Sequence, residues 1–127
     1  MQLNPDCIRD ILFKCEECCT IKTRYRFAAN EEFTKDNRTY SFEETLYHLR
    51  QCKLNDYFVN PTEDFEGNFT VSDLTPKAHE FLADIRSNSV WDKTKSIAKE
   101  LGVFSLHGLS KIAVQVISAI INKHIGI

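Results

Sequence analysis

The sequence predicts an α+β fold that is mostly helical. Apolar residues recur at the spacing of an amphipathic helix along several stretches of the chain. Two short β-prone runs, Tyr57–Val59 and Phe69–Val71, are separated by turn-forming residues. The order of helix, short helix, helix, hairpin and helix predicts a winged helix-turn-helix core with a two- or three-stranded wing and a C-terminal helical extension.

The first predicted helix runs from Pro5 to Cys19. Asn4 can cap its N-terminus, proline suits its first position, and Asp6 suits the positive end of the helix dipole. We expect its apolar stripe to face the core. That stripe consists of Ile8, Ile11, Leu12, Cys15 and Cys19.

Residues 20–40 carry weaker signals. The alternation in Thr23–Phe27 predicts a short strand, and Asn30–Lys35 is predicted to form one short helix. Asp36 and Asn37 are typical of a turn. The short helix would be the first of the helix-turn-helix pair.

The second helix of that pair is predicted from Ser41 to Leu54. Ser41, with Glu44 three residues later, matches a capping box. One face carries apolar residues that we expect to pack against the first helix, namely Phe42, Leu46 and Leu49. The opposite face would be exposed and would carry Glu44, Tyr47, His48 and Gln51, with Glu43 and Arg50 beside it.

Three further helices are predicted after the wing. Thr75 caps the first at Pro76, Ser89 with Asp92 opens the second, and Gly102 suits its end. The last runs from about Ser105 to Lys123 and is too polar on one side to span a membrane. We therefore predict a winged-helix domain at residues 1–86 and a helical extension at residues 87–127, packed on the core or in a dimer. Trp91 is expected to be a core or docking aromatic that fastens the last helix to the domain.

Cysteine usage and the N-terminal residues predict a cytoplasmic protein. The start lacks the basic segment and apolar run of a signal peptide. The five cysteines are an odd number, and three of them crowd together at Cys15, Cys18 and Cys19; a secreted framework favours an even, spaced set. We expect these three to pack as small apolar residues, with a redox or metal role as the alternative, and we predict no metal site and no cofactor.

Three segments of the chain resemble one family. They are Leu3–Leu12, Tyr40–Gln51 and Asp73–Arg86, the last followed by Val90–Lys95. Together they look like the bacterial and phage family called domain of unknown function 2513. The resemblance implies a winged-helix-like fold and no established activity. Asn55 and Asp56 stand where this family usually has Ala-Gly, but both residue types tolerate a left-handed turn.

The leading functional hypothesis is a DNA-binding or transcription-regulatory accessory protein. If the Ser41–Leu54 helix enters the major groove of double-stranded DNA, its exposed face reads the bases. The DNA-contact candidates are Tyr47, His48, Arg50 and Gln51, with Arg24, Arg26 and Arg38. Against this, residues 1–75 hold nine Lys/Arg and fourteen Asp/Glu, and carboxylates oppose phosphate binding.

The alternative is a protein–protein interaction module that uses the same scaffold without nucleic acid. Its interface would be the apolar face of the last helix, which we expect to be covered by the core or by a second copy, with adsorption to a membrane surface as the alternative. The homodimer candidates are Leu109, Ile112, Val116 and Ile120. No catalytic residue and no small-molecule substrate are predicted, because the sequence contains none of the familiar nucleophile, zinc or nucleotide motifs.

Overall fold

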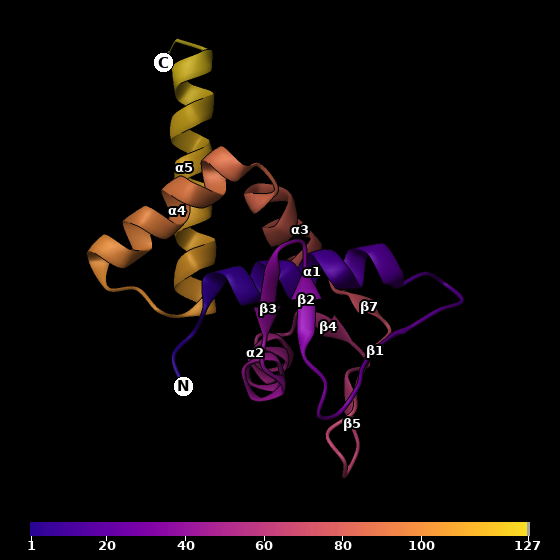
Figure 1. Cartoon of the computed structure of the whole chain (residues 1–127). Coiled ribbons are helices and arrows are strands. Elements are labelled where there is room, and N and C mark those ends of the chain that lie inside the picture. Colours follow the sequence, from indigo (N-terminus) through magenta and orange to yellow (C-terminus); the bar gives the residue numbers. More distant parts are fainter. Residues whose placement is uncertain (127) are drawn as a thin grey trace.

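The computed structural model describes residues 1–126, which form an α+β protein with small antiparallel sheets (Figure 1). The first part of the chain mixes helices and strands, and the last part is helical. In chain order the elements are α1 (Pro5–Cys18), β1 (Tyr25–Phe27), β2 (Phe33–Lys35), β3 (Arg38–Tyr40), α2 (Phe42–Leu54), β4 (Phe58–Val59), β5 (Thr62–Glu63), β6 (Phe69–Val71), β7 (Asp73–Leu74), α3 (Pro76–Ile85), α4 (Asn88–Leu101) and α5 (Leu106–His124).

Helix α1 lies at the centre of the molecule and contacts α2, α3 and β7 (Figure 1). Its predicted N-cap is confirmed, because the Asn4 side chain accepts a hydrogen bond from the Asp6 amide. Its predicted stripe faces the core, and four of its members have no exposed surface: Ile8, Ile11, Leu12 and Cys15. These side chains join one continuous core that extends to Leu109 of α5.

The predicted short helix at Asn30–Lys35 is wrong, because β2 and β3 form a hairpin there. Phe33 pairs with Tyr40 across the hairpin, and their rings stack with centroids 5.9 Å apart on the buried side. Thr34 and Thr39 pair on the exposed side. A side-chain alternation of two residues is that of a strand, and Asp36, at a φ of 56°, forms the predicted turn. The described chain therefore has a β-hairpin at the residues where the first helix of a helix-turn-helix pair was predicted.

The predicted hairpin after α2 is present as a longer ribbon. Phe58 pairs with Leu74, and Thr62 pairs with Thr70, so the two arms keep one register from β4 to β7. The ribbon is interrupted at residues 60–61, where Asn60 has a φ of 48° and proline supplies no amide donor. Strand β6 pairs with β5 on one side and β1 on the other, which makes a three-stranded sheet.

The C-terminal helices pack on the core of their own chain. Helix α5 contacts both α3 and α4, and its last turns extend beyond the rest of the molecule (Figure 1). Thr75 caps α3 as predicted, whereas α4 is capped by Ser87 rather than Ser89. Trp91 is 2% exposed, as predicted for a core aromatic, and its indole joins α4, rather than the last helix, to α1. None of the helices within residues 1–126 has the length and apolar character needed to cross a bilayer.

Candidate functional site

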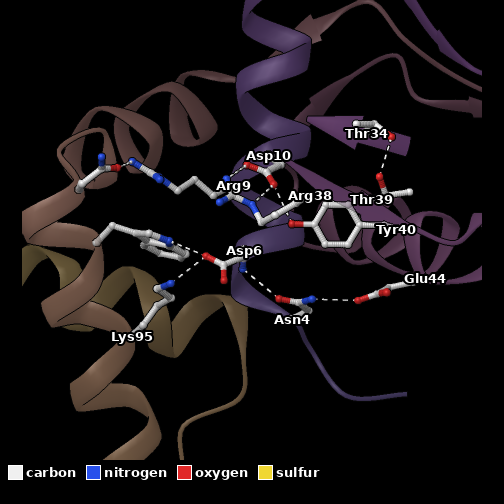
Figure 2. A network of polar contacts seen from close by, with 12 residues as sticks. Asn4, Asp6, Arg9, Asp10, Thr34, Arg38, Thr39, Tyr40, Glu44 and Lys95 are labelled. Carbon is white, nitrogen blue, oxygen red and sulfur yellow. Dashed lines mark hydrogen bonds and ion pairs between the residues drawn. The ribbon is translucent and has the colours of Figure 1, made fainter. Parts of the chain in front are cut away.

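A buried polar network surrounds the N-terminal half of α1 (Figure 2). Asp10 is 1% exposed and accepts two hydrogen bonds from Arg38, each 2.8 Å long. It also accepts a third from the Tyr40 hydroxyl at 2.7 Å. The network therefore joins α1 to the β2–β3 hairpin, and it engages a guanidinium that the sequence predicted as a DNA contact.

A second branch of the network joins α1 to α4. The Asp6 carboxylate accepts hydrogen bonds from the Trp91 indole and from the Lys95 ammonium, both at 2.9 Å (Figure 2). Partial burial opposes the ionisation of Asp6, but these two hydrogen bonds outweigh it and lower the pKa of the carboxyl. Arg9 donates to the backbone oxygens of Ile85 and Arg86, where α3 ends. These contacts hold the C-terminal helices against α1.

The predicted exposure of His48 is wrong, because its side chain is 1% exposed. The imidazole accepts a hydrogen bond from the Asn4 amide at 2.7 Å and lies 2.7 Å from the backbone oxygen of Glu44. Burial lowers the pKa of His48, which keeps the ring neutral. Glu44 does not complete a capping box, since its carboxylate accepts from the Asn4 side chain instead. A histidine held in this way is not available to contact a base.

The burial of His48 reflects a rotation of α2 about its axis relative to the predicted orientation. Its buried residues are Thr45, His48, Leu49 and Cys52, whereas Phe42 and Leu46 are only partly buried. Every buried side-chain nitrogen and oxygen of residues 1–126 has a hydrogen-bond partner. The network therefore contains no unpaired polar group that would await a ligand, and we interpret it as structural.

The other predicted DNA contacts differ in their exposure and in their ion pairing. Arg50 forms a bidentate ion pair with Glu63 of β5, in which its Nε lies 3.0 Å and its Nη2 lies 2.6 Å from the two carboxylate oxygens. Arg24 and Arg26 are exposed and form no ion pair with the described residues. Tyr47 and Gln51 are partly buried on α2.

The cysteine cluster lies at the C-terminal end of α1. Cys15 is buried, while Cys18 and Cys19 are partly exposed. A hydrogen bond with Cys15 lowers the pKa of Cys19 to about 7, despite the opposing effect of burial. Within residues 1–126 no three His, Cys, Asp or Glu side chains are arranged to hold a metal ion.

A groove of about 510 Å³ lies between α4 and α5, outside the core. Its floor is apolar, and three lysines belong to its lining. The lining residues are Lys93, Ile97, Leu101, Lys111, Ile112, Gln115, Val116, Ala119, Ile120 and Lys123. Leu101 is 67% exposed and Ile120 is 38% exposed.

Three of the four predicted interface residues line this groove, namely Ile112, Val116 and Ile120. Leu109 does not, because it has no exposed surface and belongs to the core of its own chain; its prediction as an interface residue is wrong. The contribution of α4 was missed. Its signal is present in the sequence, since Lys93, Ile97 and Leu101 follow one another at four-residue spacing.

Comparison with known proteins yields one family. A family model described as a hypothetical protein (DUF2513) matches residues 2–104. No curated protein and no solved structure matches the chain. The matched residues include the whole polar network and end before α5.

Proposed function

The chain belongs to the DUF2513 family of hypothetical proteins, and we propose that it is a non-enzymatic interaction module that binds another polypeptide in the α4–α5 groove. The observation that carries the proposal is the exposed apolar floor of this groove. Exposed, contiguous apolar surface in a concave site marks binding surfaces more often than it marks idle ones.

The rest of the chain serves in this proposal as a rigid support for the groove. We infer that α1, β1, α2 and the β4–β7 ribbon form a variant winged helix, in which the β2–β3 hairpin replaces the first helix of the helix-turn-helix pair. The pairing of β1 with β6 and the position of α2 before the ribbon support this assignment. The Asp6 contacts with Trp91 and Lys95, together with the hydrogen bond from Arg9 to the Asn88 side chain, then fix α4 relative to α1, so that one wall of the groove is positioned in advance.

A selection experiment tests the interaction module. A displayed library of helical peptides is selected against the full-length chain, and the enriched peptides are titrated against wild type and two variants. We expect Ile120→Glu, inside the groove, to weaken binding about tenfold or more, because it places a charge on the apolar floor. Val114→Glu, on an exposed α5 residue outside the groove lining, should leave binding unchanged. A selection that yields only peptides insensitive to Ile120→Glu contradicts the proposal.

DNA binding is the second candidate, and the exposed Arg24 and Arg26 on and beside β1 are what favour it. Arg38 and Arg50 would have to leave their carboxylate partners before they could neutralise phosphates. Fluorescence anisotropy with a mixed duplex at about 50 mM salt separates the two candidates. We expect binding no tighter than about millimolar; a tighter complex that Arg24→Ala with Arg26→Ala weakens would favour the DNA function instead.

A further inference from the structure

We propose that the occupant of the α4–α5 groove is an amphipathic helix with acidic residues beside its apolar face. This inference rests on the proposed function and deepens it, because it names the chemistry of the partner. The shape of the groove, the spacing of its apolar residues and its positive charge support this occupant.

The shape of the groove suits a rod. Helices α4 and α5 cross (Figure 1), and residues of both helices line the groove. Two crossing helices leave a concave trough, and an α-helix, with a diameter of about 10 Å including side chains, is the element that fills such a trough by its own apolar stripe. Concavity argues against a lipid surface, because adsorption to a bilayer requires an apolar face that projects outward.

The apolar residues of the groove match this occupant. Ile97 and Leu101 contribute from α4, and Ile112, Val116 and Ile120 contribute from α5. Both sets follow the four-residue spacing of one helix face. A partner helix with apolar residues at positions i, i+3, i+4 and i+7 presents a stripe that can bury itself against both walls.

The charged residues of the groove predict which residues lie beside the apolar face of the partner helix. Lys93, Lys111 and Lys123 are the charged residues of the lining, and no carboxylate belongs to it. The acidic residues of α4, Asp92 and Glu100, lie outside the lining. None of the three lysines forms an ion pair with any described residue. The groove therefore presents uncompensated positive charge around an apolar floor, and acidic flanks complement it.

The same charges argue against a second copy of this chain as the occupant. A two-fold dimer places the same patch of both copies face to face. The lysine-bearing groove would then meet its own lysines, and like charges brought together oppose association. The acidic helix is free of this repulsion.

Two designed peptides test the inference with the full-length protein. Both are labelled helices of about 18 residues with the same leucine stripe, and they differ only in carrying Glu or Lys beside it. We expect the acidic peptide to bind at least about tenfold more tightly at about 50 mM salt, and this advantage to shrink at about 500 mM salt, where charges are screened. Fluorescence anisotropy measures both affinities.

A charge-reversal variant supplies the matched control. Lys93→Glu with Lys111→Glu and Lys123→Glu should reverse the preference, so that the basic peptide binds more tightly. Lys22→Glu with Lys53→Glu and Lys99→Glu changes the net charge equally outside the groove lining, and should leave the acidic preference in place. Circular dichroism melting confirms that both variants fold.

Any of the following results overturns the inference that the partner is an acidic amphipathic helix. If both peptides bind equally and Ile120→Glu removes both, the interaction module stands and the acidic partner is wrong. If neither peptide binds and no displayed helix binds either, both proposals fail. If the chain binds phosphatidylglycerol vesicles but neither peptide, or if sedimentation shows a dimer that Ile120→Glu dissociates, the groove is occupied by a membrane or by a second copy.

Discussion

At the scale of single residues, His48 shows how one buried ring connects distant segments. Its side chain accepts from the amide of Asn4, 44 positions away, and the same Asn4 caps α1. His48 thus accepts the hydrogen bond of the backbone amide that immediately precedes α1. Its other ring nitrogen lies against the backbone oxygen of Glu44 in α2. A buried neutral histidine is costly to protonate, so its role can be measured by pH.

We predict that acid weakens the fold through His48. In the folded chain the pKa of His48 is lowered, whereas the unfolded chain takes up a proton near the ordinary value of 6.5. The free energy of unfolding should be fully retained above about pH 6.5 and should fall as the pH drops below that value, since the unfolded state then binds more protons. Urea unfolding at several pH values measures this.

The variant His48→Gln is the control for this effect. It should be less stable than wild type by about 1–3 kcal/mol at neutral pH, because the Asn4 amide loses a well-placed acceptor. Over the same pH window its stability should change less than that of wild type. Parallel pH profiles for the two proteins would show that His48 is not the group responsible.

At the scale of elements, local backbone signals decide where the helices end. Helix α4 ends at Gly102, which has a φ of 70° and leads the chain back into α5. A Cβ at this position would meet no atom within 4 Å. The only cost of a side chain here is therefore the left-handed backbone, which glycine adopts freely.

We predict that Gly102→Ala lowers the free energy of unfolding by about 1 kcal/mol. Gly102→Asn should lower it less, because asparagine tolerates the left-handed region better than alanine. Urea unfolding of the three proteins measures the order. If alanine were as stable as glycine, the left-handed C-cap would not contribute to stability.

At the scale of the whole molecule, α5 both completes the core and exposes the groove. Leu109 of α5 has no exposed surface, whereas Ile121 of the same helix is 51% exposed. The family match ends at residue 104, before α5. The segment that forms one wall of the groove therefore lies outside the part of the chain that relates it to its family.

We predict that two alanine substitutions in α5 have very different effects on the free energy of unfolding. Leu109→Ala should lower the free energy of unfolding by about 2–5 kcal/mol, because it leaves a cavity in the core. Ile121→Ala should change it by no more than about 0.5 kcal/mol, because its side chain is already in solvent. Thermal and urea unfolding measure both, and sedimentation velocity serves as a check. If Leu109→Ala altered only the association state, its burial within the chain would be wrong.

Five of the six predicted helices, and most of their N-terminal caps, could be recognised from the sequence. Asn4, Ser41 and Thr75 act as the predicted caps, and the stripe of α1 faces the core as predicted. Caps and helical periodicity depend on residues within a few positions of each other, so they can be recognised in one segment at a time. The three predicted interface residues that line the groove share one face of one helix, so the same periodicity placed them together.

The remaining features of the fold and of the candidate site could be seen only in the tertiary structure. The β2–β3 hairpin depends on the fit of Phe33 and Tyr40 against the core, and the burial of His48 depends on Asn4. Arg38 was assigned to DNA because the sequence does not show that a buried Asp10, 28 positions earlier, accepts its hydrogen bonds. The groove likewise requires two helices to be placed side by side. Each of these features is a contact between segments far apart in the chain, and their strength depends on burial, which no local pattern of residues specifies.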